Sequence, residues 1–205
     1  MKLPGEFYTI IKGVWPMLAI FIVVLSAVRI TYVIEKKERF IFYKEFFTLL
    51  FIVYILLLFE LVSSTDIQGV SNNFVPFKEI TRYEIGSKYF MWNVVGNMVI
   101  FVPFGFIVSY ILDSKKIIKP LFLTLVASLT IEFVQMYIGR SFDVDDILLN
   151  CIGGFAGFLL FVAIRAVRSH LPKFLQRDGV YNFLTIIIIL VIILSIFNWW
   201  GLFIK

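Results

Sequence analysis

The chain has 205 residues, of which 60% are apolar and only 16% are charged, and its formal net charge is +5. Soluble domains average roughly 45–50% apolar and about 25% charged residues, and a chain of this length cannot bury so much apolar surface in one aqueous core. The composition therefore argues against a soluble enzyme, a nucleic-acid-binding protein, a secreted disulfide scaffold and a disordered chain, and it indicates that lipid is the solvent.

Six apolar runs approach the roughly 20 residues that a helix needs to cross a bilayer. They lack the alternation of apolar and polar residues found in membrane barrels, and the helix is the other backbone conformation that satisfies its own hydrogen bonds in lipid. We therefore predict an all-α fold, a multi-pass transmembrane helical bundle. In chain order the predicted spans are residues 14–34, 46–63, 90–112, 117–138, 147–164 and 181–200.

The spans predict a membrane core over residues 46–168, with an N-terminal segment (1–45) carrying the first span and a C-terminal segment (169–205) carrying the sixth. Eleven Lys and Arg residues accompany the loops after the first, third and fifth spans, against seven on the other side. Because cytoplasmic loops carry the excess of basic residues, both termini of this cell-membrane protein are predicted to be extracellular. Loops 64–89 and 139–146 then share the outer side.

Polar side chains interrupt the third, fourth and fifth spans, where they are costly unless paired or functional. They lie near the outer ends of these spans, so residues distant in sequence reach a similar depth. We expect them to line a polar pocket that opens to the outer face. The residues are Asn93 and Asn97, Glu132 and Gln135, and Asp146 and Asn150.

The segment that enters the fifth span carries several acids, and Asp143 or Ser141 can cap the start of that helix. Asp143 and Asp145 are equally explained as exposed caps, and Asn97 and Asn150 as hydrogen-bonding contacts between helices. Further along the same face, Gly153 and Gly157 form a G-x-x-x-G pair that permits close helix packing. In the third span, Pro103 is expected to bend the helix and free a carbonyl.

Glu132 needs a partner within the membrane, and Arg140 is the nearest basic residue that follows it. This pair either braces the fold or belongs to a functional site. The chain holds one cysteine, Cys151, and one histidine, His170, which makes a zinc site improbable. No cofactor is expected from the sequence.

Five segments in this order resemble the VanZ family of bacterial membrane proteins, over about residues 46–168. They are Asn73-Phe-Val-Pro-Phe77, Asn93-Val-Val-Gly-Asn97 continuing to Phe101-Val-Pro-Phe-Gly105, Ile131-Glu-Phe-Val-Gln135, Gly139-Arg-Ser-Phe-Asp-Val-Asp-Asp146, and Leu149-Asn-Cys-Ile-Gly-Gly154 with Gly157. The resemblance implies one role, reduced susceptibility to teicoplanin-type glycopeptides. It identifies the fold more firmly than any activity.

Two sets of candidate residues follow. The candidate ligand-binding residues are Asn97, Glu132, Gln135, Arg140, Asp143, Asp145, Asp146 and Asn150. The candidate structural residues are Asn73, Pro76, Phe77, Asn93, Pro103, Gly105, Gly153 and Gly157. The expected partners are membrane lipids and, at the pocket, a cell-wall precursor lipid or a lipoglycopeptide; no nucleic acid is expected.

Three functions compete at this stage. The sequence favours a non-enzymatic envelope protein that binds a lipid-linked or peptide headgroup. The alternative is a membrane enzyme acting on a phospholipid or polyprenyl-linked substrate, with Glu132 and Asp146 as its catalytic carboxylates. The third is a structural partner of other envelope proteins, for which the packing residue Gly157 would matter more than Arg140.

Overall fold

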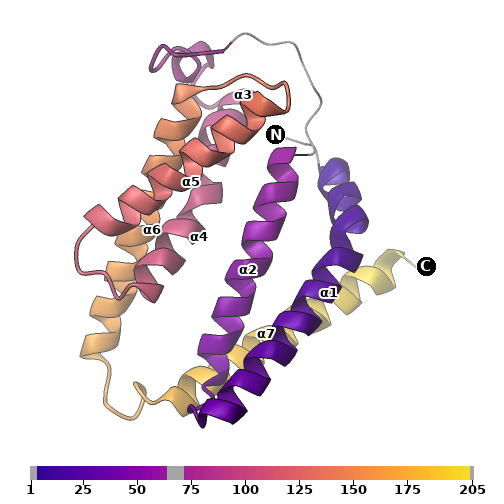
Figure 1. Cartoon of the computed structure of the whole chain (residues 1–205), viewed down its shortest axis with the longest axis vertical. Helices are drawn as coiled ribbons and strands as arrows, with labels where there is room; N and C mark the ends of the chain where they lie inside the picture. The colour runs from indigo at the N-terminus through magenta and orange to yellow at the C-terminus, as the bar shows by residue number, and fades with distance from the viewer. Residues whose placement is uncertain (1–3, 64–71, 204–205) are drawn as a thin grey trace.

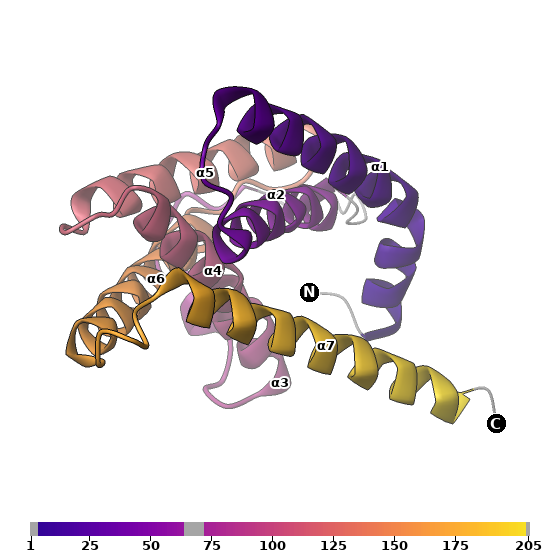
Figure 2. The ribbon, with the colours of Figure 1, turned by 90° about the horizontal axis from the view of Figure 1, so that it is seen from below.

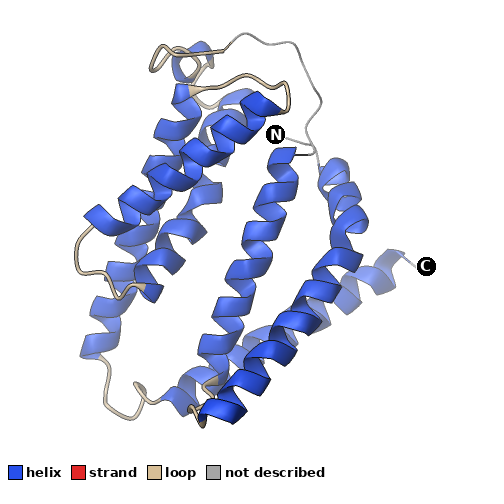
Figure 3. Cartoon of the chain, in the orientation of Figure 1, coloured by secondary structure: helices blue, strands red, loops and turns tan. Residues whose placement is uncertain are grey.

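The computed structural model describes residues 4–63 and 72–203, with side chains for 13–60 and 72–195, and these parts of the chain are helical without any strand (Figure 3). Six of the helical segments are long and apolar enough to cross a membrane, as the sequence predicted. The elements are α1 (Pro4–Lys36), α2 (Phe42–Ser63), the 3-10 turn η1 (Ile80–Arg82), α3 (Lys88–Phe90), the π-helical turn η2 (Met91–Val95), α4 (Gly96–Ile111), α5 (Ile118–Tyr137), α6 (Val144–His170) and α7 (Asp178–Phe203).

The helix ends differ from the sequence prediction where local chemistry sets them. α6 begins at Val144 because the Asp143 side chain accepts a hydrogen bond from the backbone N–H of Asp145. The helix continues to His170 and ends at Leu171, whose extended backbone precedes Pro172. The third predicted span is one continuous helical stretch, Lys88–Ile111, made of α3, η2 and α4.

Helices α4, α5 and α6 pack together on the left of Figure 1, and we call them the central helices because they form the best-packed part of the fold; α4 and α6 make the closest approach. A Cβ atom added to Gly105 of α4 would lie 2.7 Å from Cα of Gly154 in α6. One added to Gly153 would lie 2.9 Å from the carbonyl carbon of Met98. One added to Gly157 would lie 2.6 Å from the backbone nitrogen of Phe106. Glycine on both helices therefore brings the two backbones together.

Helix α2 packs against α4 through aromatic side chains. The ring centroids of Phe51 and Phe104 are 6.0 Å apart, and the Tyr54 hydroxyl donates a 2.7 Å hydrogen bond to the carbonyl oxygen of Ile100. Pro103 lies inside α4 and lacks the N–H that would bond the neighbouring carbonyl of Val99. Tyr54 thus adds a hydrogen bond to α4 in the turn that the proline weakens.

Helices α1 and α7 lie away from the central helices and expose most of their apolar side chains, which suits contact with lipid. Seen from below, α7 extends away from the other helices (Figure 2). Arg29 joins α1 to the start of α2 through a 2.9 Å ion pair with Glu45, and it also contacts Glu38 at 3.3 Å.

Candidate functional site

The segment around Asn73 and the segment before α6 meet at one end of the central helices, at the top of Figure 1. The Asn73 N–H donates to the Phe142 carbonyl at 2.8 Å, and the Val144 N–H donates to the Asn73 carbonyl at 3.1 Å. The Asn73 side chain also donates to Oδ1 of Asp143 at 2.8 Å. Two loops about 70 residues apart in sequence are thereby joined edge to edge.

An aromatic row accompanies this junction. Phe74 stacks on Phe142 with ring centroids 5.3 Å apart. Phe142 in turn lies 5.9 Å from Phe133 of α5. Such pairs contribute about 0.5–1.5 kcal/mol each beyond the area that they bury. The row therefore holds the joined loops against the end of α5.

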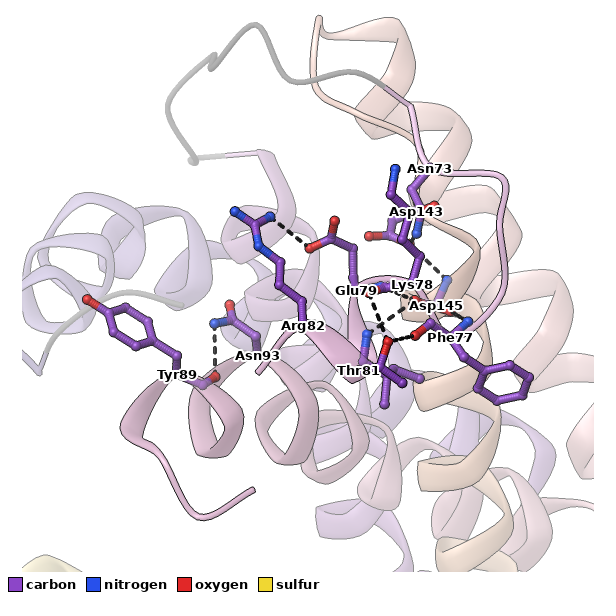
Figure 4. A network of polar contacts seen from close by, with 11 residues as sticks. Asn73, Phe77, Lys78, Glu79, Thr81, Arg82, Tyr89, Asn93, Asp143 and Asp145 are labelled. Carbon is purple, nitrogen blue, oxygen red and sulfur yellow. Dashed lines mark hydrogen bonds and ion pairs between the residues drawn. The ribbon is translucent and has the colours of Figure 1, made fainter. Parts of the chain in front are cut away.

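Asp145 is the residue that holds the segment after Asn73 in place (Figure 4). Its Oδ1 accepts the N–H of Phe77 at 2.5 Å, and its Oδ2 accepts the N–H of Glu79 at 2.7 Å and that of Ile80 at 3.3 Å. Phe77 has a φ of +66°, a left-handed conformation that is rare for an aromatic residue. Only 1% of Asp145 is exposed, and both of its carboxylate oxygens accept hydrogen bonds from backbone N–H groups of the protein.

Asp143 joins α6, α5 and the Asn73 segment. Its side chain caps α6, and its own N–H donates to Oε2 of Glu132 at 2.8 Å. Burial raises the pKa of the Asp143 carboxyl, while the bonds from the Asp145 N–H and the Asn73 amide act in the opposite direction. The cap predicted for Asp143 is therefore present, and the same carboxylate also accepts a hydrogen bond from Asn73.

Gln135 lies between Glu132 and Arg140. In the amide orientation that satisfies both neighbours, its nitrogen donates to Oε1 of Glu132 at 3.0 Å and its oxygen accepts from Nη1 of Arg140 at 2.8 Å. Gly139, with a φ of +87°, ends α5, and the Arg140 N–H bonds back to the Gln135 carbonyl at 2.9 Å. This turn returns Arg140 to the helix end where Glu132 is buried.

The asparagines of the spans have separate partners. Asn97 donates to Oδ1 of Asp146 at 2.6 Å and links α4 to α6. Asn93, which the sequence places on the same face, donates instead to the Tyr89 carbonyl of its own helix at 2.9 Å. Asn93 itself lies within the π-helical turn Met91–Val95, whereas Asn97 belongs to α4. Asn150, one turn below Asp146, donates to the Ser128 hydroxyl at 2.9 Å.

The structure thus brings eight residues into one region, which we call the polar cluster: six are joined by hydrogen bonds, and the Asn97–Asp146 pair adjoins them because Asp146 follows Asp145 in the chain. Its members are Asn73, Asn97, Glu132, Gln135, Arg140, Asp143, Asp145 and Asp146. Asn93 and Asn150 lie outside it. Among the described residues, no group of three or more His, Cys, Asp or Glu side chains is arranged to hold a metal ion.

Two polar residues of α5 were missed by the sequence analysis. Ser128 pairs with Asn150, and Thr124 lies where a Cβ on Gly154 would be 3.0 Å from its Cβ. Their spacing carried the signal, because Thr124, Ser128 and Glu132 recur every four residues and share one helix face. All three are almost completely buried.

Ser128→Ala is expected to lower the free energy of unfolding by about 1–3 kcal/mol. The change leaves the buried Asn150 amide without its acceptor, and an unmade hydrogen bond at a buried donor costs this much. Thermal unfolding of the purified protein in detergent measures the loss. Thr130→Ala is the matched control, because the Thr130 hydroxyl is on the same helix, is exposed and bonds only its own backbone. Equal stability of both variants would contradict the role of Ser128.

Comparisons with known proteins concern the stretch that carries these residues. A family model described as VanZ/LLP1 matches residues 45–165, which run from α2 into the last third of α6. Protein VanZ of Enterococcus faecium is 28% identical over 116 residues, a match that covers 56% of this chain and 66% of that protein, just under two thirds of its length. No solved structure shows a significant match.

Proposed function

Since the chain belongs to the VanZ family, whose model matches more than half of it, we propose that it lowers susceptibility to teicoplanin-type glycopeptides by binding a lipid-linked or peptide headgroup at the polar cluster. The proposal describes a non-enzymatic protein of the bacterial cell envelope. The observation that carries it is the polar cluster at one end of three apolar helices.

The members of the cluster divide by the use of their polar atoms. Glu132 and Asp145 are each 1% exposed and bind backbone N–H groups, so we assign them to shaping the site. Arg140, Asn97 and Asp146 are only partly buried. We assign the ligand contact to these three residues, because they combine accessibility with polar chemistry.

This combination suits a headgroup that carries both charged and neutral polar groups. An arginine guanidinium binds phosphate or carboxylate through directed N–H donors. Asp146 accepts hydrogen bonds from amines, amides or hydroxyls, and Asn97 orients it with a 2.6 Å bond. A precursor lipid with a phosphate and a peptide stem, or a lipoglycopeptide, presents such groups together. With the orientation proposed from the loop charges, the cluster faces the outer leaflet.

The test is complementation of a strain from which the gene has been deleted. We expect the wild-type gene to raise the minimal inhibitory concentration of teicoplanin, and Arg140→Gln and Asp146→Asn to abolish this rise. Asp113→Asn is the matched control, because Asp113 is exposed, lies at the opposite end of the bundle and pairs with Arg165. Immunoblots of membranes check that all variants are present at equal levels.

Two results would overturn the proposal. No difference between deleted and complemented strains with either teicoplanin or vancomycin removes the resistance function. Full resistance with both Arg140→Gln and Asp146→Asn removes the polar cluster as the site.

A further inference from the structure

Two tyrosine rings in tilted contact lie beneath cations at the end of the bundle opposite the polar cluster. The ring centroids of Tyr43, near the start of α2, and Tyr181, near the start of α7, are 5.4 Å apart. The guanidinium carbon of Arg168, from the last turn of α6, lies 5.0 Å from the centroid of Tyr181. Nζ of Lys44 lies 5.8 Å from the centroid of Tyr43. Three helices thus contribute to one arrangement, which we call the tyrosine platform.

Hydrogen bonds hold the platform in addition to the contact between its rings. The N–H of Tyr43 donates to Oδ1 of Asn182 at 3.0 Å, and its hydroxyl donates to Oδ1 of Asp178 at 3.3 Å. Tyr43 is 7% exposed, so its position is fixed between α2 and α7. The ring of Tyr43 beneath Lys44 is therefore held in a defined position.

The charges at the platform are unbalanced. Neither Arg168 nor Lys44 forms an ion pair with any residue that the structure describes, whereas Arg165, one turn earlier in α6, pairs with Asp113 at 2.7 Å. Asp178, the acid that contacts the platform, is shared between Tyr43 and Arg39. Two exposed cations are therefore available to an anion.

The geometry of Arg168 and Lys44, and their level relative to the membrane, indicate which kind of anion they bind. The guanidinium of Arg168 lies over the Tyr181 ring, and guanidinium N–H donors match phosphate oxygens in number and direction. The platform lies where α2 and α7 begin and α6 ends, which is the headgroup level of a membrane around these spans. Basic residues between transmembrane helices at this level attract anionic lipids.

We propose that Arg168 and Lys44 bind the phosphate of an anionic phospholipid on the tyrosine platform. The lipid would bridge the central helices and α7, since Arg168 belongs to α6 and Tyr181 to α7. This site is separate from the polar cluster and does not depend on the glycopeptide proposal.

Native mass spectrometry of the full chain, released from mixed phosphatidylcholine and phosphatidylglycerol nanodiscs, tests the site. We expect retention of phosphatidylglycerol over phosphatidylcholine by the wild type. Arg168→Gln should weaken that retention about tenfold, the loss expected for one charge-assisted hydrogen bond. Arg165→Gln is the matched control and should retain the lipid, because Asp113 already neutralises Arg165.

A second pair of variants tests the ring itself. Tyr181→Phe keeps the aromatic ring and should bind as the wild type does, whereas Tyr181→Leu removes the ring and should weaken binding as Arg168→Gln does. An equal loss in Arg165→Gln and Arg168→Gln would show diffuse attraction and overturn the site, as would equal retention of the two lipids. Displacement of the lipid by sn-glycerol 3-phosphate alone would overturn the lipid assignment in favour of a soluble phosphate.

Discussion

Gly105→Ala is expected to lower the free energy of unfolding by about 3 kcal/mol, at the upper end of the usual range for an overpacked core. The new Cβ would lie 2.7 Å from the Cα of Gly154, a backbone atom that cannot rotate away. Helices α4 and α6 would have to separate, which also moves Asn97 away from Asp146. Thermal unfolding in detergent, followed by circular dichroism, measures the effect.

Gly13→Ala is the control for this change, because Gly13 is also inside a helix and a Cβ there meets nothing within 4 Å. Alanine favours the helix over glycine by up to about 1 kcal/mol, so Gly13→Ala should leave stability unchanged or raise it. If Gly105→Ala proved as stable as Gly13→Ala, the result would contradict the close approach of α4 and α6 at Gly105 and Gly154.

Asp145→Ala is expected to cost about 3 kcal/mol or more, because it removes the acceptor of three backbone N–H groups at once. The segment from Phe77 to Ile80 would lose its anchor, and with it the left-handed conformation of Phe77. Limited proteolysis should then cut within residues 72–87, and the unfolding midpoint should fall.

Asp145→Asn and Glu79→Gln calibrate this prediction. The asparagine keeps one carbonyl oxygen and should show a smaller loss than alanine. Among the described residues, the Glu79 side chain forms an ion pair with the exposed Arg82, so Glu79→Gln should change stability by less than about 1 kcal/mol. Resistance of Asp145→Ala to cleavage at the wild-type level would mean that the carboxylate does not hold this segment.

These two changes act on different parts of one assembly. The glycines set the distance between α4 and α6. Asp145 sets the position of the segment from Phe77 to Ile80 beside the polar cluster. If the polar cluster binds the proposed headgroup, both variants should reduce resistance without altering Arg140 or Asp146 themselves. Loss of resistance in them alone would not identify the ligand contacts, which is why Arg140→Gln and Asp146→Asn are the direct tests.

The sequence alone was enough to predict that lipid surrounds the chain, where the six spans lie, and that the polar residues gather at one end of the bundle. Hydropathy is a local property of about 20 residues, so each span could be recognised without knowing its neighbours. Since consecutive spans alternate in direction, the start of the third span, the end of the fourth and the start of the fifth had to lie at the same end of the bundle. The family motifs were recognisable for the same reason, because they are short continuous segments.

The tertiary structure decided which polar atom meets which. Asp145 and Asp146 are adjacent and chemically identical, yet one binds the Phe77–Ile80 backbone and the other binds Asn97. Successive helical residues point about 100° apart, so the choice depends on how α6 is rotated against α4. Packing of Gly105 on Gly154 sets that rotation, and it involves residues about 50 positions apart that no local pattern connects.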